Sequence, residues 1–118
     1  MTLTLDLDTI LNNLVNELGP SVYFILISST NGVIMKSYIN EDEFNKAAIS
    51  LNISQIYELA EETAQDIGLH NPDFNITHSD NYYILSMKIL EHLVILLTED
   101  QVEVKEIFKI INQSVNPV

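Results

Sequence analysis

The clearest structural signal in the chain lies in residues 22–34, which read Val22-Tyr23-Phe24-Ile25-Leu26-Ile27-Ser28-Ser29-Thr30-Asn31-Gly32-Val33-Ile34. The first six residues are aliphatic or aromatic strand formers, as in a central strand that is covered on both faces. Asn31-Gly32 favours a tight hairpin turn because both residues tolerate a positive φ. The segment therefore predicts two antiparallel strands, Val22–Ile27 and Val33–Tyr38, joined by this turn.

Helical patterns flank this hairpin on both sides. Between Asp6 and Leu18, apolar residues recur at spacings of three and four, which predicts an amphipathic helix. Gly19-Pro20 ends that helix because proline cannot continue it. After the hairpin, Asn40-Glu41-Asp42-Glu43 resembles a capping box with Asn40 as the N-cap, and the helical pattern continues to Ile67. This helix would have about 27 residues, more than the usual ~11–12.

The last third of the chain predicts three strands and a closing helix. Phe74–Ser79 alternates apolar and polar residues, as a half-exposed strand does. Tyr82–Ile89 and His92–Leu97 form the next two predicted strands around a tight turn at Leu90-Glu91. Thr98–Gln101 resembles a capping box for the last helix. This order of elements indicates one sheet with helices on both faces.

Composition excludes several functions. The 118 residues fit a single domain spanning 1–118. The net charge is −12, from 17 acidic and 5 basic residues, and all five basic residues are lysines. Because phosphate binding needs clustered basic side chains, we expect no nucleic-acid partner and no attachment to an anionic membrane. Without cysteine, a signal peptide or an apolar run long enough to span a membrane, the expected location is cytoplasmic.

The sequence predicts no catalytic residue, no cofactor-binding residue and no metal ligand. His70, His78 and His92 fall in different elements and lack partners at metal-ligand spacing. The acidic clusters Glu41-Asp42-Glu43 and Glu61-Glu62 are interpreted as a helix N-terminus and a solvated helix face. The chain has no phosphate-binding glycine loop and no pairing of a nucleophile with a base. We therefore expect a protein that is not an enzyme.

The predicted long helix carries more apolar surface than one sheet contact needs, which is an arc of only ~100°. One apolar face comprises Phe44, Ala47, Ala48, Leu51 and Leu59. A second lies about 150° further round and comprises Ile49, Ile53, Ile56, Ala60, Ala64 and Ile67. We expect one face to pack on the sheet and the other on a partner helix. A helix buried on all sides within one subunit is the alternative.

The strand that follows this helix adds to the expected interface. Phe74–Ser79 would be an edge strand, and it carries no lysine or proline to block pairing with another strand. An open edge beside an apolar helix face favours a two-fold dimer. The predicted dimer interface consists of Ile49, Ile53, Ile56, Tyr57, Ala60, Ala64, Ile67, Phe74, Ile76 and His78.

The order of elements, and the hydrophobic strand that ends in a small polar turn at Asn31-Gly32, resemble the roadblock domain family of the dynein light-chain roadblock type, over nearly the whole chain. The resemblance implies an α+β fold, arranged as an α/β/α sandwich. Its roadblock/profilin-like five-stranded antiparallel sheet has one long helix on one face and two shorter helices on the other. It also implies a homodimer, or a dimer with a paralogous roadblock protein, built on residues 40–67 and 74–79. Roadblock proteins commonly regulate or scaffold Ras-like small GTPases.

Two other functions remain open at this point. One is a structural adaptor subunit, and the other is a small-molecule sensor of profilin- or PAS-like topology. A sensor needs an internal pocket, whereas the aliphatic strands here favour a filled core. If the chain accelerates GTP hydrolysis, it does so without an arginine finger, because it contains no arginine.

Overall fold

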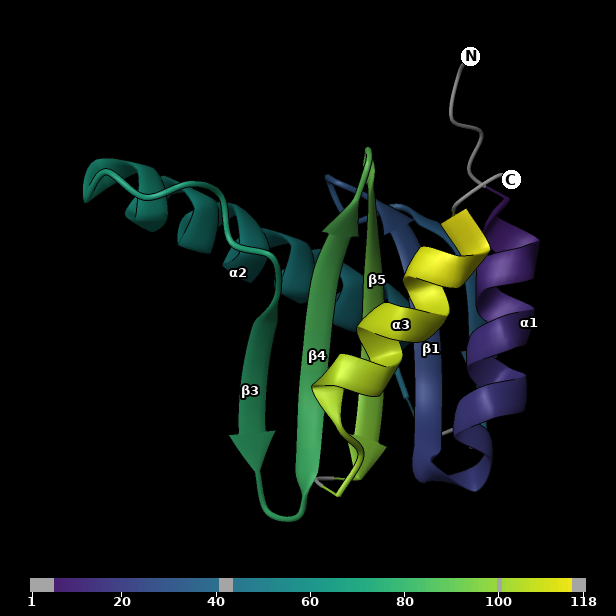
Figure 1. Ribbon diagram of the computed structural model, residues 1–118. Coiled ribbons are helices and arrows are strands. Elements are labelled where there is room, and N and C mark those ends of the chain that lie inside the picture. The colour runs from purple at the N-terminus through teal and green to yellow at the C-terminus, as the bar shows by residue number, and fades with distance from the viewer. Residues whose placement is uncertain (1–5, 41–43, 100, 116–118) are drawn as a thin grey trace.

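A computed structural model describes residues 6–40, 44–99 and 101–115. Three α-helices surround one sheet (Figure 1). The helices are α1 (Leu7–Leu18), α2 (Lys46–Asp66) and α3 (Val104–Val115), and a short 3-10 turn, η1 (Gly19–Ser21), follows α1. The strands are β1 (Val22–Ser29), β2 (Ile34–Ile39), β3 (Asn75–Ser79), β4 (Tyr82–Ile89) and β5 (His92–Glu99).

The five strands form a single antiparallel sheet in the order β2-β1-β5-β4-β3. Strand β1 lies next to β5 in the middle of the sheet, and its residues Val22 and Phe24–Ser28 are buried. This arrangement confirms the sequence prediction of a strand covered on both faces. Strand β3 lies at one edge, as expected for Phe74–Ser79, and β2 forms the other edge.

Helices α1 and α3 pack against each other on one face of the sheet. Their inward-facing residues, such as Leu14 and Ile107, join a core cluster with Ile25 of β1 and Leu96 of β5. The Asn13 Nδ2 atom donates to Ser114 Oγ at 2.7 Å, which ties the two helices together. This layer is a complete aliphatic core.

Helix α2 crosses the opposite face of the sheet and contacts β1, β2 and β5 there. A smaller buried cluster, including Phe24, Leu26 and Tyr57, fills the space between them. In Figure 1 the C-terminal half of α2 continues past β3 and leaves the sheet behind. The long helix is therefore only partly supported by its own subunit.

Both predicted capping boxes differ from the structure. Helix α2 has 21 residues, and its cap is Asn45, whose Oδ1 accepts from the Ala48 amide at 3.1 Å. Asn40 instead donates its amide to the Tyr23 carbonyl at 2.9 Å, which extends the pairing of β2 with β1. Glu41–Glu43, the rest of that predicted box, lie outside the described residues. In the second box, Thr98 and Glu99 belong to β5, and Asp100 is likewise outside the described residues.

Candidate functional site

The sheet-facing side of α2 is built from two serines and two large apolar residues. Ser50, Ile53, Ser54 and Tyr57 are its buried residues. The small serines leave room for the β1–β2 turn, where a Cβ atom on Gly32 would lie 2.9 Å from Ser54 Oγ. Ser50 Oγ also donates to the Gly32 carbonyl at 2.9 Å. Close packing against this turn therefore sets the rotation of α2 about its axis.

Tyr57 ties three segments together beneath α2. Its hydroxyl donates to the Pro72 carbonyl at 2.8 Å and accepts from the Lys88 amide at 3.3 Å. The side chain is only 2% exposed, and burial raises the pKa of its phenol above the usual value. Tyr57 thus holds the loop that leads into β3 against the end of β4.

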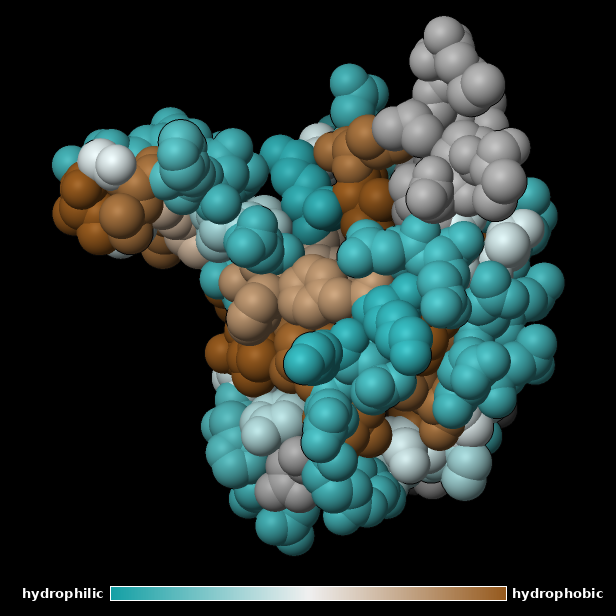
Figure 2. Space-filling view, viewed as in Figure 1, coloured by the Kyte–Doolittle hydropathy of each residue, from teal (hydrophilic) through white to brown (hydrophobic). Residues whose placement is uncertain are grey.

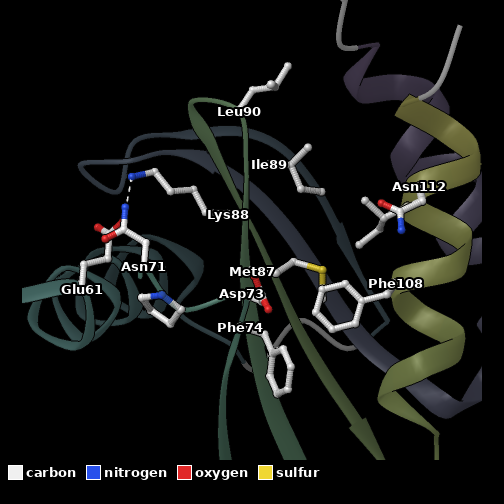
Figure 3. Close-up of a pocket in the computed structure, with 12 residues that line it drawn as sticks. Glu61, Asn71, Asp73, Phe74, Met87, Lys88, Ile89, Leu90, Phe108 and Asn112 are labelled. Carbon is white, nitrogen blue, oxygen red and sulfur yellow. Dashed lines mark hydrogen bonds and ion pairs between the residues drawn. The ribbon is translucent and has the colours of Figure 1, made fainter. Parts of the chain in front are cut away.

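An ion pair reinforces the same junction. Lys88 Nζ on β4 lies 3.0 Å from Glu61 Oε2 on α2, as the dashed line in Figure 3 shows. Within the described ranges, Glu61 is the last polar residue of α2 whose side chain contacts the sheet. Beyond Glu61 the helix extends past the sheet (Figure 1), so this pair is the last anchor of α2 on the sheet.

The C-terminal half of α2 exposes large apolar side chains. Ile56 is 47% exposed, Leu59 is 63% exposed and Ile67 is 69% exposed. Ala60 and Ala64 lie between them and are half-buried. Figure 2 shows the hydrophobic residues at the tip of this projection. We call these five residues, Ile56, Leu59, Ala60, Ala64 and Ile67, the overhang.

The structure divides the α2 residues of the predicted dimer interface into two groups. Ile53 and Tyr57 are buried against the sheet of their own subunit, and Ile49 packs beside them. Ile56, Ala60, Ala64 and Ile67 belong to the overhang. The two predicted helix faces are therefore wrong in part, because the face that meets the sheet runs through Ile53 and Tyr57.

Leu51 and Leu59 belong to the first apolar face predicted for the helix, which is not part of the predicted dimer interface. Their side chains are nevertheless 48% and 63% exposed. Neither residue packs on the sheet. A leucine in an amphipathic helix is expected to face the core. Here the close packing of Ser50 and Ser54 against Gly32 fixes the rotation of the helix so that both leucines face outward. Sequence analysis had no signal for this rotation, because it depends on a turn that is distant along the chain.

The strand residues of the predicted interface lie on the other face of the sheet. Ile76 is paired with Leu85, which belongs to the core under α1 and α3. Directly paired residues point to the same face, so Ile76 and His78 lie on the α1/α3 side. Phe74 also points there, since its ring centroid lies 5.1 Å from that of Phe108 on α3. The structure thus does not bring these three residues together with the overhang.

The outer edge of β3 is open along the described part of the chain. Its five residues, Asn75–Ser79, pair with β4 on one side only. On the α2 face of this strand stand polar side chains, among them Thr77, which pairs with Ile84. The open edge and the overhang lie at the same border of the sheet (Figure 1).

Clusters of side chains that could bind a metal or catalyse a reaction are scarce in the described residues. Among them, no three His, Asp or Glu side chains gather as metal ligands would. No helix in the described ranges is long and apolar enough to cross a membrane. The arrangement of the overhang and the open edge is suited to binding a macromolecule.

No family model and no curated protein matches this chain. Solved structures do match it. A Roadblock/LC7 domain from Streptomyces avermitilis superposes with a TM-score of 0.78 at 13% identity, covering 93% of this chain and 92% of that one. MglB from Myxococcus xanthus gives 0.78 at 8% identity, with coverage of 93% and 91%. The gliding protein MglB from Thermus thermophilus gives 0.75 at 8% identity, with coverage of 98% and 91%. The fold implied by the sequence resemblance is therefore confirmed.

Proposed function

We propose that this chain, which has the roadblock fold, is a dimeric protein-interaction module that regulates or scaffolds a Ras-like small GTPase. The observation that carries the proposal is the overhang, a helix segment whose leucine and isoleucine side chains are about half exposed or more. Large apolar side chains gathered on one projecting element mark a surface that another protein covers.

The geometry of the overhang favours a second copy of the chain as that protein. The end of α2 beyond Glu61 projects past the β3 edge, so its apolar side chains could cover only something that lies next to β3. A strand added to the open edge of β3 would place a second sheet there. In a two-fold dimer each overhang would then lie over the partner's sheet, and one symmetric contact would cover both exposed features.

The GTPase part of the proposal rests on the family resemblance and on the fold likeness to MglB. The chain itself contains no arginine. Any acceleration of GTP hydrolysis would therefore act by positioning the residues of the GTPase rather than by inserting an arginine into its site. The net charge of −12 favours a partner surface that carries basic residues.

The dimer is tested by placing a charge on the overhang. Leu59→Glu should convert a dimer into a monomer when mass is measured by light scattering at micromolar concentration. Met35→Glu is the matched control, because Met35 is 50% exposed on β2, which forms the edge of the sheet opposite β3. A monomeric wild-type chain, or a Leu59→Glu variant that stays dimeric, would contradict the proposal.

The GTPase partner is tested separately. Ras-like GTPases encoded in the same genome should be purified, loaded with GDP or a GTP analogue, and titrated against the wild-type chain and Leu59→Glu. A regulator should change the rate of GTP hydrolysis or nucleotide release, whereas a scaffold should bind without changing either rate. Absence of binding in both nucleotide states would contradict the GTPase proposal and leave the dimer result standing.

A further inference from the structure

A second candidate surface lies beside the end of β4, mostly on the face of the sheet opposite α2, and it reaches Glu61 of α2. A groove of about 660 Å³ opens between α3 and the loop that leads into β3, and the end of β4 forms its floor. Phe108 lines the α3 side, Asp73 and Phe74 line the loop side, and Met87 and Ile89 lie in the floor. Figure 3 shows Phe74, Met87 and Phe108 close together, and Figure 2 shows hydrophobic surface between α3 and the overhang. We call this the α3 groove.

The α3 groove exists because β3 is shorter than β4. Pairing between the two strands stops at Asn75 and Ser86, so Met87–Ile89 have no strand beside them on that edge. The chain instead turns away through Phe74, whose ring meets Phe108 edge-on at 5.1 Å. Tyr57 caps this edge at the Lys88 amide. An apolar groove beside it accepts the side chains of a docked segment of polypeptide.

Leu90, at the tip of the β4–β5 hairpin, is an unusual residue at this position. It lines the groove, is 51% exposed and has a φ of +54°. That backbone region is strained for a bulky side chain, and glycine or asparagine would occupy it without this cost. Stability of the turn therefore does not explain an exposed leucine here. A contact made by its side chain would explain it.

Charge indicates the chemistry of the occupant. Of the groove's charged residues, Lys88 and Glu61 neutralise each other at 3.0 Å. Asp73 is exposed and, within the part of the chain that the structure describes, forms no ion pair. The chain as a whole has a net charge of −12. A cationic side chain beside Asp73 would thus complement both the local and the overall field.

We infer that the α3 groove binds a segment of another protein that presents two or three apolar side chains and one lysine or arginine placed to reach Asp73. The apolar side chains would lie on Ile89 and along the outer sides of Phe74 and Phe108, with Leu90 at one end and the buried Met87 beneath them. The Phe108 side of the groove lies on the face of the sheet opposite α2, and the Glu61–Lys88 ion pair closes its other side. The inference goes beyond the proposed function and does not depend on it.

The test is a selection from a displayed library of random 12-residue peptides against the purified wild-type chain. Enriched peptides should combine apolar residues with a lysine or arginine. In fluorescence anisotropy, Leu90→Gly should weaken the best peptide about tenfold, as loss of one buried leucine contact would. Leu90→Gly should keep the fold, because glycine accepts the positive φ, and a thermal melt would verify this. Asp73→Asn should weaken binding severalfold and reduce its salt dependence.

The controls separate this site from the dimer. Leu69→Gly removes a leucine that is 60% exposed and lies just beyond α2, so it should change peptide affinity less than twofold. Leu59→Glu should also leave peptide binding intact, even if it dissociates the dimer. The inference is overturned if no peptide is enriched, if enriched peptides lack a basic residue, or if Leu90→Gly has no effect. It is equally overturned if Leu90→Gly changes the oligomeric mass, or if native mass spectrometry finds a small molecule that the peptide displaces.

Discussion

The two faces of the sheet are covered to different extents. Among the described residues, the core under α1 and α3 contains twelve buried hydrophobic residues, whereas the core under α2 contains six. The first layer closes over its sheet with aliphatic side chains that meet no solvent, such as Leu14. The second layer includes serines under the helix, and its helix continues beyond the sheet.

This difference separates the stability of the subunit from its capacity to bind. The α1/α3 layer buries most of the apolar surface, so it supplies most of the hydrophobic driving force for folding. The α2 layer leaves large apolar residues exposed at Leu59 and Ile67. Apolar surface that folding leaves uncovered remains available for association, which is why we place the proposed dimer contact there.

The difference between the two layers is tested most directly by replacing one leucine with alanine in each layer. Leu14→Ala should lower the free energy of unfolding by about 2–5 kcal/mol, because Leu14 is fully buried and a cavity would remain. Leu59→Ala should change it by less than about 0.5 kcal/mol under dilute, monomeric conditions. Urea unfolding monitored by circular dichroism measures both changes. Equal losses would contradict the view that the overhang is unsupported by its own subunit.

The contact between the β1–β2 turn and α2 can be examined with a pair of glycines. Gly32 has a φ of +91°, and an added Cβ would also lie 3.0 Å from the Leu51 Cα. Gly68 has a φ of +82° with no atom within 4 Å of an added Cβ. Gly32→Ala should therefore destabilise by about 3 kcal/mol and Gly68→Ala by about 1 kcal/mol. If thermal unfolding gives equal costs, close packing at Gly32 does not set the position of α2.

Tyr57→Phe sharpens the comparison at the junction where α2 leaves the sheet. The substitution keeps the ring but removes the hydroxyl that contacts Pro72 and Lys88. We expect a loss of about 1 kcal/mol in the free energy of unfolding, typical of a buried hydrogen bond. Amide hydrogen exchange should accelerate in residues 71–75 and remain unchanged in α1. Unchanged exchange near Pro72 would mean that Tyr57 does not hold this loop.

The smallest effect on stability is expected at high pH and comes from Tyr23 on β1. Tyr23 donates to Glu99 Oε1 at 3.0 Å, and this hydrogen bond, with desolvation, raises the pKa of Tyr23 from 10.0 to about 12. A raised pKa favours the protonated phenol in the folded state. Its contribution to stability is therefore complete below pH 10 and is lost as the pH rises toward 12.

The check on this effect is the difference between the wild-type chain and Tyr23→Phe. Thermal unfolding should show the wild type losing slightly more stability than the variant between pH 10 and 12. Ultraviolet titration should show one fewer late-forming phenolate in Glu99→Gln than in the wild type, because the pKa of Tyr23 falls when the carboxylate is removed. If the melting temperatures of the wild type and Tyr23→Phe fall equally between pH 10 and 12, Tyr23 does not contribute to the loss of stability at high pH.

Much of the fold could be predicted from local patterns. The β1–β2 turn followed from Asn31-Gly32, and the end of α1 followed from Gly19-Pro20. The position of Phe74–Ser79 at an edge followed from its alternation and its place after a long helix. These features depend on neighbouring residues, whose backbone preferences act whatever the rest of the chain does. The start of α2 was missed because Asn40 and Asn45 are both capable caps and the β2 pairing selected the later one.

The candidate sites depended on contacts between distant segments. The sequence by itself determined which elements form and that one long helix carries surplus apolar surface, because periodicity and turn chemistry are local properties. Only the tertiary structure decided that Tyr57 lies inside and Leu59 outside, since Gly32 and the serines of α2 fix the rotation of the helix. Only the structure placed Phe74 beside Phe108 and thereby revealed the α3 groove. Such packing joins residues far apart in the chain, and no local pattern encodes which of them meet.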